Sequence, residues 1–157
     1  MNNRTTVERK GERDLVITRT FDAPPRIVFE AWTKSELLKR WWVPKAAPMS
    51  LLSCDVDARV GGKYRFVFAF PNAEPVAFFG TYLEVAPPSR LVWTNEESED
   101  GAVTTLTFEE KDGRTLLVMH ERYPSKEALD RSIEGMEGGL PEQFAQLDEL
   151  LPTLDLR

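Results

Sequence analysis

The chain has 157 residues, of which 41% are hydrophobic and 29% charged, and its formal net charge is −6. This length fits one domain with one core, and the composition is typical of a globular rather than a disordered protein. The negative net charge argues against binding to a nucleic-acid backbone. No apolar segment is long enough to span a bilayer, and the first residues lack a secretory signal, so we predict a cytoplasmic protein without a membrane partner.

The chain begins with a polar stretch. We predict that residues 1–13 form a flexible polar arm and that 14–157 form a single domain. Leu15–Phe21 is rich in β-forming residues and is predicted to be the first strand. The sequence Asp22-Ala-Pro-Pro is typical of a strand-to-helix junction, in which the aspartate caps the helix and the prolines fit its first turn. One short helix is expected after it, and a second begins at Ser35.

After Met49 the apolar residues alternate with polar ones for about seventy residues, which predicts an antiparallel sheet built from successive hairpins. Glycine, proline, asparagine and aspartate mark the turns, and Lys111-Asp112-Gly113 is the strongest hairpin signal. Together with the first strand this gives about seven strands. The six strands expected in this region are Met49–Val56, Lys63–Phe70, Val76–Val85, Arg90–Glu96, Val103–Glu110 and Thr115–Tyr123.

The last long segment, Ser125–Leu151, has apolar residues at intervals of three and four, which predicts an amphipathic helix. Ser125 is its expected N-cap. Gly135, Gly138 and Gly139 remove side-chain volume from its first half, and Pro141 predicts a bend. We therefore predict an α+β helix-grip fold, in which a curved antiparallel sheet wraps around the long C-terminal helix and two short helices follow the first strand.

An ordered series of motifs supports the same fold. Arg19-Thr-Phe-Asp-Ala-Pro, Trp41-Trp42-Val-Pro, Val60-Gly-Gly-Lys-Tyr and Gly80-Thr-Tyr-Leu-Glu-Val occur in this order. The series resembles the START-like (SRPBCC, helix-grip) superfamily, and within it the domain homologous to the C-terminal domain of the activator of the 90-kDa heat-shock protein ATPase. The chain departs from similar domains at Leu140-Pro141, where they commonly carry a tryptophan after the glycine.

This resemblance implies a cavity between sheet and helix for an apolar small molecule, or a surface that binds a chaperone. We predict non-catalytic binding of a mostly apolar small molecule, without a cofactor or metal, in a stress-response role. The first alternative is a co-chaperone-like interaction protein. The second is a cofactor-free cavity enzyme, such as a cyclase or hydrolase, which would need an acid or base that points into the cavity.

Aromatic strand residues and the glycine-rich half of the terminal helix are the predicted walls of this cavity. The predicted lining consists of Trp42, Tyr64, Phe66, Phe68, Tyr82, Trp93, Phe108, Met119, Met136, Gly139 and Leu140. Arg19 and Glu121 are the predicted polar anchors, and Arg65 and Tyr82 are further polar groups that could point inward. The alternative is a close-packed core without a cavity.

Other reactive residues do not form a recognisable constellation. His120 is the one histidine, and its neighbour Glu121 should point to the opposite face of the strand, so the two cannot orient each other. Cys54 is the one cysteine, which excludes an intramolecular disulfide and favours a small core residue over a nucleophile. Gly61-Gly62 precedes a strand rather than a helix, so it predicts a turn and not a phosphate site.

Overall fold

The computed structural model describes residues 5–43, 45, 49–96, 99 and 101–154, with the backbone only for 134–138. In chain order its elements are β1 (Thr6–Arg9), β2 (Asp14–Phe21), α1 (Pro25–Thr33), α2 (Ser35–Trp41), β3 (Ser50–Val56), β4 (Lys63–Ala69), β5 (Val76–Ala86), β6 (Arg90–Thr94), β7 (Val103–Lys111), β8 (Arg114–Arg122), α3 (Lys126–Leu150) and a 3₁₀ turn at Leu151–Thr153.

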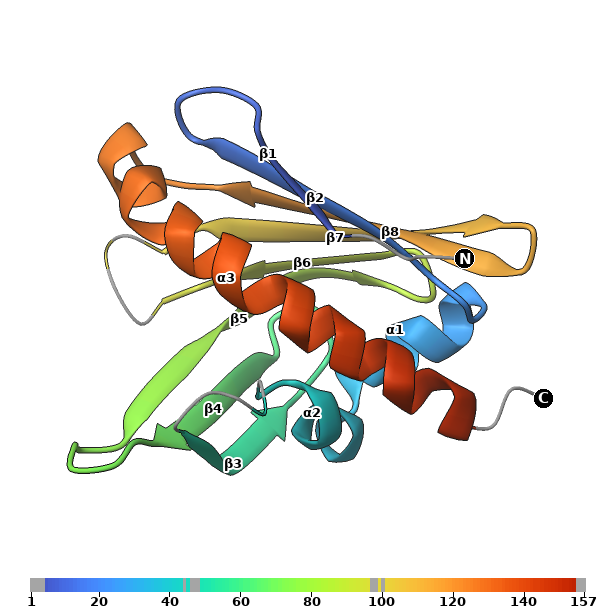
Figure 1. Cartoon of the computed structure of the whole chain (residues 1–157), viewed down its shortest axis with the longest axis horizontal. Helices are drawn as coiled ribbons and strands as arrows, with labels where there is room; N and C mark the ends of the chain where they lie inside the picture. Colours follow the sequence, from blue (N-terminus) through green and yellow to red (C-terminus); the bar gives the residue numbers. More distant parts are fainter. Residues whose placement is uncertain (1–4, 44, 46–48, 97–98, 100, 155–157) are drawn as a thin grey trace.

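The strands form one eight-stranded sheet in the order β1-β2-β8-β7-β6-β5-β4-β3. All neighbouring strands are antiparallel. The helix α3 runs across one face of the curved sheet, and α1 and α2 lie on that same side (Figure 1). This arrangement confirms the α+β helix-grip fold that the sequence predicts.

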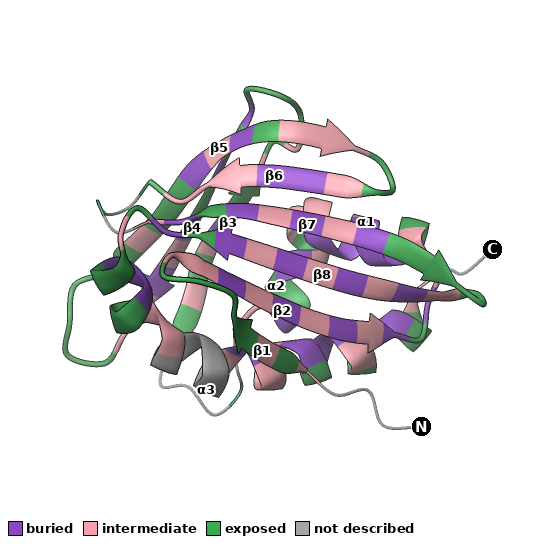
Figure 2. Cartoon of the chain, turned by 90° about the horizontal axis from the view of Figure 1, so that it is seen from above, coloured by how far each residue is buried: buried purple, intermediate pink, exposed green. Residues whose placement is uncertain are grey.

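Alternation of burial along the strands shows which face packs on the helices. In β2 and β8 every second residue is buried and those between are half-buried or exposed (Figure 2). Leu15, Ile17 and Phe21 of β2 are fully buried, because successive side chains of a strand point to opposite faces. Buried apolar side chains of the sheet, of α1 and of α3 together form one core.

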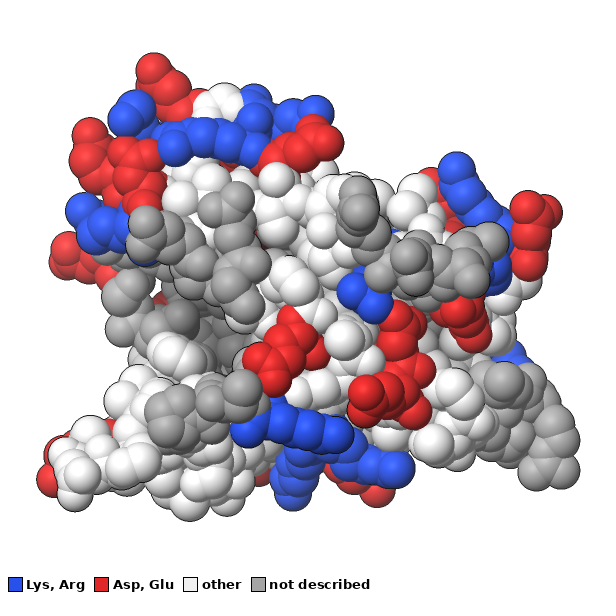
Figure 3. All heavy atoms as spheres, in the orientation of Figure 1, with Lys and Arg blue, Asp and Glu red and all other residues white. Residues whose placement is uncertain are grey.

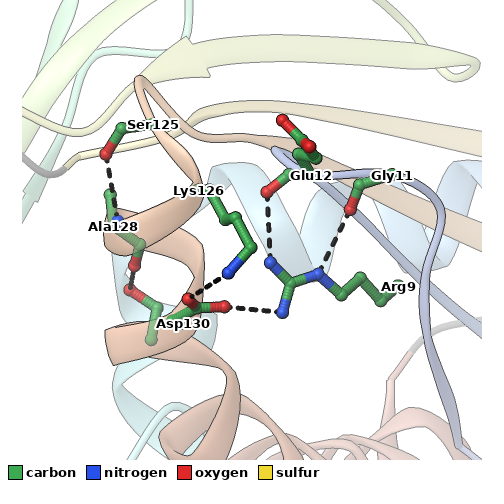
Figure 4. A network of polar contacts seen from close by, with 8 residues as sticks. Arg9, Gly11, Glu12, Ser125, Lys126, Ala128 and Asp130 are labelled. Atoms are coloured by element: carbon green, nitrogen blue, oxygen red, sulfur yellow. Dashed lines mark hydrogen bonds and ion pairs between the residues drawn. The ribbon is translucent and has the colours of Figure 1, made fainter.

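Strand β1 was not expected, because its four residues Thr-Val-Glu-Arg contain only one apolar side chain. It pairs with the edge of β2, with Thr6 opposite Thr18. Part of the stretch predicted to be a flexible arm is therefore a strand of the sheet. The guanidinium of Arg9, the last residue of β1, forms an ion pair with Asp130 of α3 at 2.6 Å (Figure 4). Arg9 and Lys126 hold the pKa of Asp130 below its usual range. The hairpin is thus attached to the first turns of α3.

Two local predictions at turns have different outcomes. Asp112 and Gly113 both have positive φ, at 54° and 80°, and join β7 to β8 as a two-residue hairpin loop, as predicted. Asp22 does not cap α1, whose N-cap is Pro24 without a side-chain hydrogen bond. The Asp22 carboxylate instead accepts a hydrogen bond from Arg114 at 2.6 Å, because the end of β2 lies beside the start of β8.

The helix α3 begins as the sequence predicts. The Ser125 hydroxyl accepts a hydrogen bond from the backbone N–H of Ala128 at 3.1 Å (Figure 4). Pro141 lies inside the helix, which continues from Lys126 to Leu150 without a break. The bend at Pro141 stays a prediction.

Gly139→Ala is expected to stabilise the domain by about 0.5–1 kcal/mol, because glycine in a helix interior costs about that much relative to alanine. A Cβ at Gly139 would meet no described atom within 4 Å, so the methyl group fits. Urea unfolding of the two proteins measures the difference. Gly113→Ala serves as the control and should be destabilising, since Gly113 has a φ of 80°. Lower stability of Gly139→Ala would contradict the prediction.

Candidate functional site

A cavity of about 150 Å³ lies between the sheet and the two short helices. Its described lining is mainly aromatic and comes from α1, α2, the residue after α2, strands β4 to β6 and the residue after β6. The residues are Trp32, Leu38, Trp42, Tyr64, Phe66, Phe78, Tyr82, Trp93 and Asn95. Figure 3 shows a recess in the surface between α3 and strands β4 and β5. Sheet curvature and the position of α1 and α2 therefore create the space.

The four tryptophans of the chain form one cluster at this cavity. Trp32 contacts Trp41, Trp42 and Trp93, with ring centroids 4.8, 5.8 and 6.1 Å apart. The Trp41 indole N–H donates to the carbonyl oxygen of Ala31 at 3.0 Å. Phe144 of α3 packs against Trp32 at 6.1 Å. Aromatic contacts of this kind contribute more to the stability of the fold than their buried area alone, and they hold the cavity wall in place.

The Gln146 side chain of α3 fixes the segment that carries Trp41 and Trp42. Its amide nitrogen donates to the carbonyl oxygens of Trp41 at 2.9 Å and Val43 at 2.8 Å. Its amide oxygen accepts from the backbone N–H of Lys45 at 2.8 Å. Gln146 falls between the apolar residues that recur along the helix, yet its side chain is buried. The signal for this role is weak: an uncharged donor and acceptor at the edge of an apolar helix face.

A buried polar network extends from the cavity wall into the sheet. The Tyr64 hydroxyl donates to the Thr94 carbonyl oxygen at 2.8 Å and lies 3.0 Å from the Asn95 amide oxygen. The Asn95 amide nitrogen donates to Thr104 Oγ1 at 3.0 Å, and the Thr104 hydroxyl donates to the Glu121 carboxylate. Glu121 is buried and lies outside the described lining, and Thr104 and Asn95 connect it to the cavity wall.

The predicted lining residues have different positions in the structure. Trp42, Tyr64, Phe66, Tyr82 and Trp93 lie in the described lining. Phe68, Phe108, Met119 and Leu140 are buried in the core instead. The side chain of Met136 lies outside the described residues, and Gly139 is half-buried beside open space.

Sequence reasoning missed four lining residues, namely Trp32, Leu38, Phe78 and Asn95. Trp32 and Leu38 have the helical spacing of ordinary core residues. Phe78 follows Ala77 and precedes Phe79, so the alternation does not tell which phenylalanine points inward. Asn95 lies inside the strand predicted at Arg90–Glu96, whereas β6 ends at Thr94.

The predicted anchor Arg19 is buried, but it does not lie in the described lining. Its guanidinium forms an ion pair with Asp148 of α3 and donates to Thr5 Oγ1 at 2.8 Å. Arg65 is exposed, because it alternates with the inward-facing Tyr64 and Phe66. The Arg19 charge is therefore paired with the helix rather than presented to the cavity.

Two other reactive side chains lie away from the described cavity lining. His120 Nε2 is 2.8 Å from the carboxylate of Asp14, on the opposite face of β8 from Glu121. Cys54 is buried, and burial raises the pKa of its thiol to about 11, so the thiol stays protonated at neutral pH.

Within the described ranges, no three His, Cys, Asp or Glu side chains are grouped so that they could hold a metal ion. None of the helices among the described residues has the length and apolar character to cross a membrane.

Solved structures with this fold extend over nearly the whole chain. A protein from Rhodobacter sphaeroides is 24% identical, with a TM-score of 0.88 over 97% of this chain and 100% of that chain. One from Nitrosomonas europaea is 27% identical, with a TM-score of 0.82 over 93% and 98% of the two chains. One from Staphylococcus epidermidis is 29% identical, with a TM-score of 0.80 over 97% of both. No curated protein matches the chain.

A family model gives the more specific assignment. The model described as "Activator of Hsp90 ATPase homolog 1-like protein" matches residues 22–152. The match begins after β2 and ends in the 3₁₀ turn after α3, so it includes every described lining residue of the cavity. The chain therefore belongs to the Activator of Hsp90 ATPase homolog 1-like family, with a START-like helix-grip fold.

Proposed function

We propose that this protein binds a small, mostly apolar molecule without transforming it, and that the aromatic cavity is the binding site. The observation that carries the proposal is the cavity of about 150 Å³ with a mainly aromatic wall. Ligand sites are typically concave and apolar with a few placed polar groups. Here Asn95, Tyr64 and Tyr82 are the side chains of the described lining with hydroxyl or amide groups.

The volume of the cavity limits the size of the ligand. A cavity of similar volume, lined by apolar side chains, accommodates benzene in another protein. Drug-sized ligands need a larger space. A molecule with one six-membered ring and a short substituent therefore fits best.

A chaperone-binding role is the second candidate, because the family is named for homology to a chaperone activator. Exposed apolar side chains on strands β3 and β5, which include Leu52, Phe79 and Leu83, also favour a contact with another protein. The protein would then stimulate ATP hydrolysis by a purified 90-kDa heat-shock protein. Loss of that stimulation in Leu83→Ser would support this second role.

The enzyme hypothesis has less support from the site. A cavity enzyme would use His120 or Glu121, but His120 pairs with Asp14 and Glu121 accepts a hydrogen bond from Thr104. Neither belongs to the described lining. Cyclase or hydrolase chemistry through these residues is therefore not part of the proposal.

Phe78→Ala is expected to weaken binding of single-ring probes about tenfold, which corresponds to about 1.4 kcal/mol of lost apolar contact. Isopropylbenzene and acetophenone are suitable probes. Binding is measured by the change in tryptophan fluorescence, because all four tryptophans lie in the cluster at the cavity, and is checked by calorimetry.

The neighbouring Phe79→Ala is the matched control. The two side chains are similarly exposed, at 38% and 39%, but they point to opposite faces of β5. Phe79→Ala should leave the affinity unchanged. Absence of saturable binding of either probe to the wild-type protein would refute the proposed function, and equal losses in both variants would place the site elsewhere.

A further inference from the structure

Tyr82 is a polar side chain in the middle of the apolar wall. It is only 4% exposed, and its ring lies 5.9 Å from that of Tyr64 and 6.3 Å from that of Trp93. The backbone of Tyr82 is fixed as well, since its N–H donates to the Gly62 carbonyl oxygen at 2.8 Å and its carbonyl oxygen accepts from the Gly61 N–H at 2.9 Å. The ring therefore has a defined position.

The Tyr82 hydroxyl makes no hydrogen bond to the described part of the chain, whereas the other hydroxyl and amide groups of the described wall do. The Tyr64 hydroxyl proton is directed to Thr94 and Asn95. The Asn95 amide nitrogen donates to Ala102 and Thr104. The Tyr82 hydroxyl proton is therefore not used within the described chain and is available to an acceptor atom of a ligand in the cavity.

The wall contains donors rather than charges. None of its described residues is Asp, Glu, Lys, Arg or His, and a charged ligand group would therefore be buried without a counter-ion. Burial also raises the pKa of Tyr82 far above its usual value, so its hydroxyl keeps its proton at physiological pH. The indole N–H of Trp32 is a second buried donor without a partner among the described groups, and an indole nitrogen cannot accept a hydrogen bond. The complementary ligand group is a neutral acceptor.

We propose that the Tyr82 hydroxyl donates a hydrogen bond to a neutral oxygen acceptor of the ligand, such as a ketone, aldehyde or ether oxygen on a single apolar ring. This inference rests on the proposed function, because it assigns the polar contact and the ligand class of the same cavity. Tyr82 then selects between apolar molecules of equal shape.

The test compares two probes of nearly the same shape, acetophenone with a carbonyl oxygen and isopropylbenzene without one. Tyr82→Phe removes the hydroxyl and keeps the ring. We expect the preference for acetophenone, taken as the ratio of the two Kd values, to fall about tenfold in Tyr82→Phe. The infrared carbonyl band of bound acetophenone should also lie at lower frequency in the wild-type protein than in the variant, since the hydrogen bond weakens the C=O bond.

Tyr123→Phe is the control, because Tyr123 is buried but lies outside the described lining, and it should leave the ratio unchanged. Tyr82→Phe should unfold at the wild-type temperature or above it, since its hydroxyl has no described partner to lose. If neither probe binds the wild-type protein, the proposed function fails. If both bind and the ratio is the same in Tyr82→Phe, the assignment of Tyr82 is overturned while the proposed function stands.

Discussion

Gly80→Ala is expected to destabilise the folded domain by at least about 3 kcal/mol, because there is no room for even a methyl group at this position. A Cβ there would lie 1.8 Å from the Thr94 carbonyl oxygen and 2.8 Å from a ring carbon of Tyr64. Gly80 pairs with Tyr64 of β4, and two residues later Tyr82 pairs with Trp93 of β6. The glycine thus allows the close approach of strands where β5 changes from one partner to the other.

Urea unfolding followed by circular dichroism measures this loss, and a protein that is already unfolded in buffer also agrees with it. Gly139→Ala is the matched comparison, since the same substitution at an open position should stabilise the domain. The two variants should therefore shift the unfolding midpoint in opposite directions. A Gly80→Ala midpoint equal to that of the wild type would mean that β5 and β6 can separate there without cost.

Gln146→Met should destabilise the domain by about 2–3 kcal/mol, because it removes three hydrogen bonds that contribute about 1 kcal/mol each. The methionine side chain keeps a similar length and shape, so the loss reports the amide rather than the packing. The carbonyl oxygens of Trp41 and Val43 and the N–H of Lys45 lose their partner. The tryptophan emission should shift to longer wavelength as Trp42 becomes more exposed, and probe binding should weaken with it.

Glu149→Met provides the control on the same helix. Its side chain is 71% exposed and its ion pair with Lys45 spans 3.6 Å, and such surface pairs contribute little. The control should keep the wild-type stability within about 0.5 kcal/mol. A similar small effect of Gln146→Met would show that water replaces the amide at no cost, and the role assigned to this side chain would be wrong.

The regular elements could be predicted from the sequence because local patterns determine them. The strand predicted at Lys63–Phe70 is observed at Lys63–Ala69, and the helix predicted from Ser125 begins at Lys126 with Ser125 as its cap. Strand β1 could not be predicted, since its formation depends on the exposed edge of β2 and not on its own four residues. The prediction that Asp22 caps α1 is wrong for a related reason: its carboxylate accepts a hydrogen bond from Arg114, which is distant in sequence.

The site was harder to predict than the fold. Alternation in β4 correctly places Tyr64 and Phe66 on the covered face, but it does not tell which covered residues border a space and which contact other side chains. Phe68 shares their face and is buried in the same core, but it does not belong to the described lining of the cavity. The role of Gln146 depends on the backbone of a segment about a hundred residues earlier, and its bonds to Trp41 and Val43 leave no pattern in the sequence.

The order of the strands has a consequence for the synthesis of the chain. From β4 to β8 each strand pairs with the one made just before it, so these hairpins can form while translation continues. Strand β2 is different, because it lies between β1 and β8, and its Phe21 pairs with Thr115 of β8. Until β8 has left the ribosome, β2 can pair only with β1, and its other edge has no partner strand. The sheet is therefore completed in this half of the molecule later than among the cavity strands.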